Sequence, residues 1–280
     1  MEKAIKRYFP IFVLPTMIAF TLGFIIPFVE GVYLSFCKFT TVNDAKFIGF
    51  ANYAKVFADE TFVHAFWYTA AFTVVSVILI NVLAFAVALL LTKCFKGTNI
   101  FRTVFFIPNL IGGIVLGYIW QLLLNGILMK FSRTLTYSST YGFWGLIILM
   151  CWQQIGYMMI IYIAGIQNIP GELIEAAEID GATKWQILKK VTIPMVMPSI
   201  TVCTFLTLTN SFKLFDQNLA LTNGEPSKMS EMLALNIFNT FYGRTGYEGV
   251  GQAKAVIFFI LVTVIALTQN YLTRRKEVQQ

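Results

Sequence analysis

The sequence predicts an all-α membrane protein with six transmembrane helices, and three observations support this. Of the 280 residues, 57% are hydrophobic and only 12% are charged, whereas soluble domains carry about 25% charged residues. The mean hydropathy is +0.70. Six apolar stretches are each long enough to cross a bilayer, which takes about 20 residues. Because lipid leaves backbone polar groups without partners, and because the polar–apolar alternation of a membrane barrel is absent, these spans must be helices.

The six spans occupy most of the chain, and their central parts contain no Asp, Glu, Lys or Arg. Their expected bounds are 11–36, 66–92, 103–124, 142–166, 193–212 and 255–271. We expect three regions: the first helix and its outer loop (1–65), a five-helix core (66–271) that includes a cytoplasmic loop at 167–192, and a tail (272–280).

The distribution of positive charge predicts the orientation of the chain. An even number of spans places both termini on one side of the membrane. Lys and Arg number 12 in the short segments on that side and 8 in the longer loops on the other. Because cytoplasmic loops are enriched in these residues, both termini are expected to be cytoplasmic. The net charge of +7 is therefore explained by topology and does not indicate nucleic-acid binding.

Several kinds of chemistry are disfavoured by the residues themselves. The four cysteines lie more than 50 residues apart and His64 is the sole histidine, so neither a metal site nor a disulfide framework is predicted. No nucleophile, base and orienting group stand at recognisable spacing, so the chain is not expected to be an enzyme. No phosphate-binding P-loop occurs. If ATP drives the protein, another polypeptide must hydrolyse it.

The loop at 167–192 is predicted to fold rather than merely connect two spans. Pro170 suits a first helical turn and Gly181 suits a helix stop, because glycine adopts the left-handed cap conformation without steric penalty. Ala176 and Ala177 permit close approach of a partner. A surface helix in the lipid interface is the alternative, but such helices favour basic polar faces. The acidic residues here are Glu172, Glu175, Glu178 and Asp180.

At this loop the sequence resembles a known family. Glu175-Ala176-Ala177, then Gly181, then Val191-Thr192-Ile193-Pro194 is similar to the EAA loop of binding-protein-dependent ABC importers, whose pattern ends Ile-x-Leu-Pro. Val191 and Ile193 are conservative departures from that ending. Further segments resemble the carbohydrate-uptake branch of the family, namely 164–170 with 179–182, 27–36, 47–53, 101–108 and 215–222. Gly224-Glu225-Pro226 and Tyr68-Thr69 depart from sequences frequent in relatives, and they weaken any inference about the particular sugar.

The resemblance implies a type I ABC importer permease fold in a bacterial cell membrane and a role in sugar or oligosaccharide import. It also implies a second six-span permease, two P-loop ATPase subunits that bind the ATP and Mg²⁺, and an external sugar-binding protein. This chain itself would hold no cofactor. The residues that match the ATPase-coupling loop are Glu175, Ala176, Ala177, Asp180, Gly181 and Pro194.

The sequence identifies the substrate pathway less specifically than the coupling loop. Hydroxyl, amide and aromatic groups inside the spans suit an uncharged sugar, although such groups also bond their own backbone, bond neighbouring helices or mark the lipid interface. The candidate pathway residues are Thr204, Asn210, Ser211, Trp152, Gln153 and Gln121.

The main alternative is a secondary transporter driven by an ion gradient. Proton or sodium coupling usually places acidic residues or histidine within the membrane, and the span centres have none. Sodium coupling through backbone carbonyl groups remains open. A channel is disfavoured because neither a Thr-Val-Gly-Tyr-Gly filter nor an Arg-rich sensor helix is present.

Overall fold

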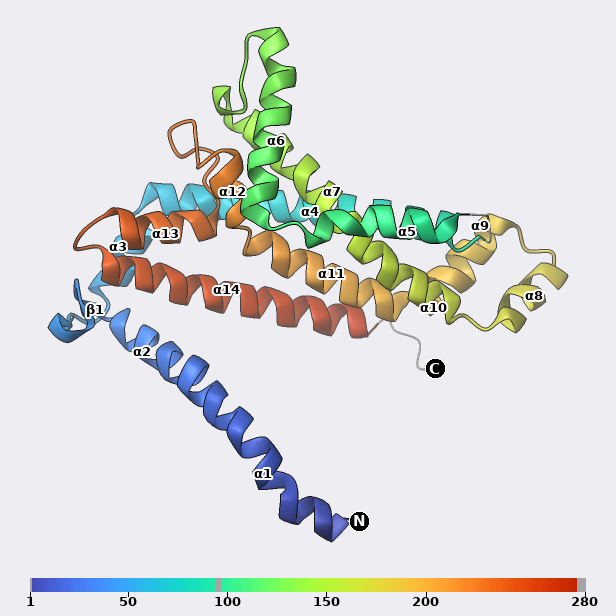
Figure 1. Cartoon of the computed structure of the whole chain (residues 1–280), viewed down its shortest axis with the longest axis horizontal. Coiled ribbons are helices and arrows are strands. Elements are labelled where there is room, and N and C mark those ends of the chain that lie inside the picture. Colours follow the sequence, from blue (N-terminus) through green and yellow to red (C-terminus); the bar gives the residue numbers. More distant parts are fainter. Residues whose placement is uncertain (1, 94–96, 276–280) are drawn as a thin grey trace. The chain divides into compact units, whose positions relative to one another are not determined.

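The computed structural model describes residues 2–93 and 97–275, so Cys94 and residues 276–280 of the expected tail lie outside the described residues. The described chain is mostly helical (Figure 1). It forms two compact units: Met1–Glu60 with Ile237–Ile260, and Thr61–Asn236 with Leu261–Gln280. The boundaries between the units fall after the first residue of α4 (Glu60–Leu91) and inside the helices α13 (Leu233–Gly243) and α14 (Glu248–Arg274).

The first unit contains the first predicted span. The helices α1 (Glu2–Phe20) and α2 (Ile26–Leu34) are joined by a π-helical turn, Thr21–Ile25. Two short antiparallel strands follow, β1 (Cys37–Lys38) and β2 (Lys46–Phe47), with Cys37 opposite Phe47. The helix α3 (Ala51–Phe57) completes the connection to the second span.

Buried polar contacts hold the first unit together. The Asn52 amide donates to the backbone oxygens of Ser35 and Cys37 at 2.9 and 2.8 Å. The Lys254 ammonium lies 2.7 Å from the Asp59 carboxylate and 2.8 Å from the Thr240 hydroxyl. Lys254 is fully buried, so this ion pair fixes the beginning of α14 against the residues that follow α3.

The second unit contains the main apolar core. Leu149, Met158 and Tyr162 are among its most buried members. The helices of this unit before α13 are α4 (Glu60–Leu91), α5 (Thr98–Phe106), α6 (Gly113–Leu128), α7 (Ser139–Gln167), α8 (Gly171–Ile179), α9 (Lys184–Ile187), α10 (Ile193–Met195), α11 (Met197–Phe212) and α12 (Asp216–Leu221).

The prediction of six spans agrees with the described helices. Five are long and apolar enough to cross a membrane, and the bent pair Lys184–Met195 and Met197–Phe212 brings the number to six. The bend is 69°. It lies at Val196, so the straight part of the fifth span begins later than the predicted 193. Pro198 in the first turn of α11 explains this, since proline is accepted at a helix start.

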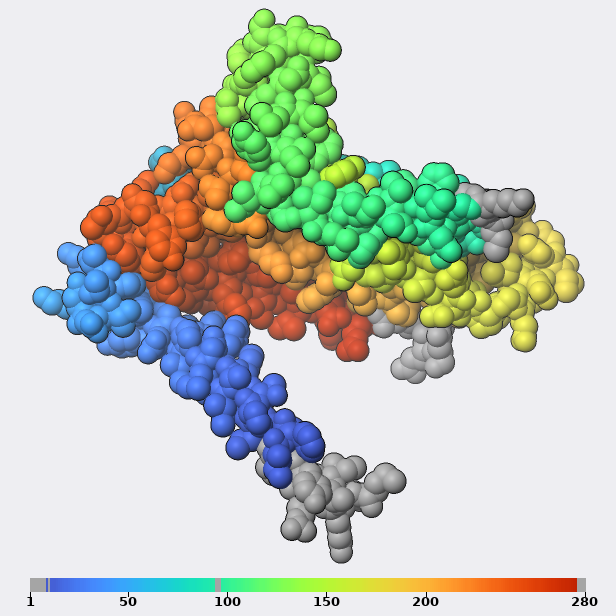
Figure 2. Space-filling view, viewed as in Figure 1, coloured from blue at the N-terminus to red at the C-terminus, as the bar shows by residue number. Residues whose placement is uncertain are grey.

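The predicted third span, 103–124, is wrong as a single helix. A 3-10 turn, Ile107–Leu110, separates α5 from α6, and the apolar helix that can cross a membrane is Gly113–Phe131. Pro108 lacks an N–H donor, and the Gly112-Gly113 pair weakens helix continuity. In Figure 2 the α6 segment projects from the rest of its unit.

Glycines allow the helices of the second unit to approach closely. A Cβ on Gly113 or Gly117 of α6 would lie 2.7 Å from the Cβ of Asp216 or Ala220 of α12. The Gly-x-x-x-Gly spacing thus forms the α6–α12 contact, as small residues do at membrane helix interfaces. A Cβ on Gly156 of α7 would lie 1.7 Å from the backbone oxygen of Phe105, so α5 packs directly on α7.

Candidate functional site

The predicted loop helix is present as α8. Pro170 occupies the N-cap, one position before the first turn in which it is expected. Glu172 lies in the first turn, where its negative charge interacts favourably with the helix dipole. Gly181 has φ +76°. The Gly181 N–H donates to the backbone oxygen of Glu178 at 3.0 Å, and the Ala182 N–H donates to the backbone oxygen of Ala177 at 2.9 Å. These two bonds form a Schellman cap, which requires the left-handed residue that glycine supplies.

The surface of α8 is largely uncovered within this chain. Glu175, Ala176 and Asp180 are exposed, and Ala177 is half-buried. Ile179 is 86% exposed and Trp185, in the following turn, is 69% exposed. Exposed apolar side chains beside acidic ones form a mixed surface of the kind that protein partners cover.

The remainder of the loop leads into the bent fifth span. Thr183 and Gln186 form a capping box at the start of α9. A π-helical turn, Leu188–Thr192, then continues into α10, which contains Pro194. Pro194 therefore lies just before the 69° bend rather than at the start of the straight span. One helical segment, Lys184–Met195, thus joins the turn after α8 to the base of α11.

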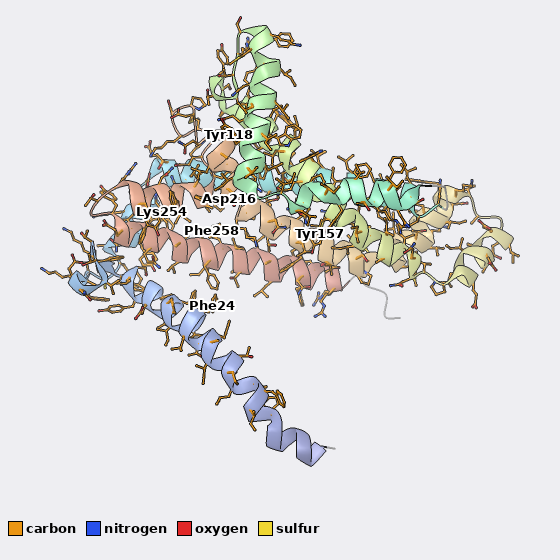
Figure 3. The ribbon with its side chains drawn as sticks, viewed as in Figure 1. Phe24, Tyr118, Tyr157, Asp216, Lys254 and Phe258 are labelled. Carbon is orange, nitrogen blue, oxygen red and sulfur yellow. The ribbon has the colours of Figure 1, made fainter. Side chains whose placement is uncertain are left out.

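A polar cavity of about 310 Å³ lies between α7 and the junction of α11 with α12. Asp216, labelled in Figure 3, lies at this junction. The Gln154 side chain is buried, and its Oε1 has no hydrogen-bond partner among the described residues. A bound polar group would satisfy this oxygen. The lining residues are Met150, Gln154, Asn210, Lys213, Leu214, Phe215, Asp216 and Gln217.

The structure brings some of the predicted pathway residues to this cavity. Asn210 lines it. Gln153 adjoins it, because Gln217 donates to the Gln153 Oε1 at 2.9 Å. Ser211 is fully buried, and among the described side chains its hydroxyl has no partner.

The other predicted residues lie elsewhere. Gln121 donates to the Leu221 backbone oxygen at 3.1 Å and so ties α6 to α12. Trp152 is 44% exposed and contacts Trp120 edge to face. Thr204 is half-buried and does not line the cavity.

The sequence did not identify four polar cavity residues: Gln154, Lys213, Asp216 and Gln217. Gln154 adjoins the selected Gln153, and an amide pair in an apolar span was a usable signal. Lys213 and Gln217 follow the fifth span, where polar residues are ordinary. Only the break between α11 and α12 turns them toward α7.

Comparison with known proteins gives consistent matches. Residues 87–278 match the family model described as "Binding-protein-dependent transport system inner membrane component". The probable starch degradation products transport system permease protein AmyD of Thermoanaerobacterium thermosulfurigenes is 42% identical over 278 residues, covering 96% of this chain and 94% of its own.

Two solved structures match nearly the full length. A chain of a bacterial ABC transporter involved in the import of the acidic polysaccharide alginate has a TM-score of 0.83 at 23% identity, covering 98% of both chains. A chain of the bacterial alginate ABC transporter in complex with an alginate pentasaccharide-bound periplasmic protein has a TM-score of 0.82 at 21% identity. The match covers 98% of this chain and 97% of that chain. These likenesses establish the fold and confirm the predicted importer-permease architecture.

Proposed function

Since the chain belongs to the family of binding-protein-dependent transport system inner membrane components, we propose that it forms, with a second six-span permease, the pathway for a sugar or oligosaccharide. Membership confirms the predictions of a multi-pass inner-membrane protein and of a transport subunit rather than an enzyme. In the proposal an external binding protein delivers the sugar and two ATPase subunits supply the energy. Both termini lie in the cytoplasm.

The observation that carries the proposal is the geometry of α8. A helix that ends in a Schellman cap at Gly181 and exposes Glu175, Ala176 and Ile179 is preorganised for docking. We assign the ATPase as the partner. ATP binding would move α8, and the segment through Pro194 would transmit that motion to α11. Such a mechanism needs two states with different affinities for the nucleotide-bound partner.

The cavity supports an uncharged, hydroxyl-rich substrate. Gln154 and Asn210 offer amide groups, which donate and accept hydrogen bonds. Lys213 and Asp216 are of opposite charge, so the lining carries no net charge that would select an ionic ligand. The relative AmyD is named for starch degradation products, and a short glucose oligomer is the substrate we propose.

Uptake measurements test the cavity assignment. Cells that carry the whole transporter and Gln154→Leu should take up labelled maltooligosaccharide with a raised KM, because the variant removes an amide from the cavity while keeping its volume nearly constant. Gln269→Leu is the matched control. Gln269 donates to the Thr201 backbone oxygen and does not line the cavity. Equal uptake kinetics in both variants, at equal protein levels, would overturn the cavity assignment.

A further inference from the structure

The short helix α3 has two chemically distinct faces. Phe50, Tyr53 and Phe57 recur at the helical spacing i, i+3, i+7 and lie on one side. Asn52 and Val56 lie on the other side and are buried. Phe50 is 73% exposed and Phe57 is 69% exposed. The helix therefore turns two large aromatic side chains away from its own unit.

The first span fixes the depth of this segment in the membrane. The charge-free stretch of this helical segment runs from 8 to 29 and Glu30 follows it, exposed on the helix surface. These 22 residues measure about 33 Å along the helix, close to the roughly 30 Å of a hydrocarbon core. Glu30 therefore marks the core boundary. The helix continues to Leu34, about 6 Å further, which is the approximate thickness of one headgroup layer.

Ring contacts with Phe36 show that the exposed aromatic residues lie at about the same depth as the end of the first span. Phe36 lies two residues beyond the end of α2, and its ring centroid lies 5.3 Å from that of Phe50 and 6.4 Å from that of Phe47. Phe47 is 66% exposed. The strand pair that carries Phe47 is held by Asp44, whose carboxylate accepts from the Thr40 and Thr41 N–H groups, and these bonds lower the pKa of the Asp44 carboxyl.

The exposed charge on residues 36–60 is basic on balance, with three lysines against Asp44 and Glu60. Lys38, Lys46 and Lys55 are exposed. The Asp59 carboxylate is engaged by Lys254. Exposed lysines beside phenylalanine rings are typical of segments that lie in the headgroup region of a membrane and are attracted to anionic lipids.

We propose that the surface formed by Phe47, Phe50 and Phe57 is a membrane anchor, that is, a surface that contacts the lipid headgroups. These rings insert between headgroups of the leaflet opposite the N-terminus, and Lys38 and Lys46 contact lipid phosphates. The anchor fixes the height of the first span, whose apolar window has no buried residues within this chain. This assignment does not depend on the transported substrate.

Site-directed spin labelling tests the anchor. The full chain, with Cys94 and Cys151 replaced by alanine, is labelled at Phe50→Cys or Phe57→Cys and reconstituted in vesicles of phosphatidylcholine and phosphatidylglycerol. Lys55→Cys is the matched control, because Lys55 is exposed on the same helix outside the aromatic face. Cys37 and Cys203 are buried and stay in place.

Power saturation then compares collisions of each label with oxygen and with the water-soluble nickel chelate Ni-EDDA. We expect the oxygen-to-nickel ratio at positions 50 and 57 to exceed that at position 55 several-fold. Equal ratios at all three positions would place the aromatic face in water and overturn the proposal. A change at position 50 that appears only after the external binding protein is added would assign the surface to that protein instead.

Discussion

Replacement of Gly181 tests whether the shape of α8 controls the coupling of the permease to its ATPase. Gly181 has φ +76°, and a Cβ built there meets nothing within 4 Å. The cost of a side chain is therefore conformational rather than steric. An L-residue in the left-handed conformation costs about 1–2 kcal/mol, and Asn tolerates it better than Ala.

This cost has a measurable consequence. A penalty of 1–2 kcal/mol lowers the equilibrium ratio of capped to uncapped loop by a factor of roughly 5–30. Sugar uptake, and the amount of ATPase that co-purifies with the permease in detergent, should therefore fall in the order Gly181, Gly181→Asn, Gly181→Ala and Gly181→Val. A β-branched residue is the least compatible with positive φ.

The other end of the same helix provides the control. Gly171 is exposed, has no positive φ, and its Cβ would also meet nothing within 4 Å. Gly171→Ala should retain uptake, because alanine is a better helix former than glycine. If Gly181→Val and Gly171→Ala had the same uptake and the same ATPase recovery, the cap would have no role in coupling.

Two further predictions concern stability, each measured as the thermal unfolding midpoint of the purified chain in detergent. Gly156→Ala should lower the midpoint strongly, because the new Cβ would lie 1.7 Å from the Phe105 oxygen and force α5 away from α7; Gly126→Ala, which meets nothing within 4 Å, should leave it unchanged. Lys254→Met should cost about 3–5 kcal/mol by breaking a buried ion pair, and Asp59→Asn in the same chain should recover part of the loss. A midpoint that is insensitive to either destabilising change would contradict the described packing.

The helices were largely predictable because the bilayer imposes a simple length rule. The loop helix was also predictable, since Gly181 and the acidic first turn act locally. The break between α5 and α6 was not, because Pro108 lies in a continuous apolar stretch and membrane helices often tolerate proline. The close approach of Gly156 to Phe105, which places α5 against α7, depends on tertiary packing that no local pattern encodes.

The cavity shows the same limit. Asn210 was recognised from its amide in an apolar span, but the facing Gln154 and the inward turn of Gln217 depend on how α7, α11 and α12 meet. Gln121 was selected on the same chemical ground and instead ties α6 to α12. Residue type thus identified polar groups in the spans, while the fold decided which of them share a cavity.

Photocrosslinking from α8 tests the central claim most directly. Benzoylphenylalanine replaces Ile179, which is 86% exposed on α8, or Tyr137, which is 61% exposed in the 3-10 turn Leu135–Tyr137 between α6 and α7. Membranes from cells that carry the complete transporter are then irradiated. The account predicts an adduct with a P-loop ATPase from position 179 and none from position 137. A position-179 variant that transports sugar normally and yields no ATPase adduct would contradict it.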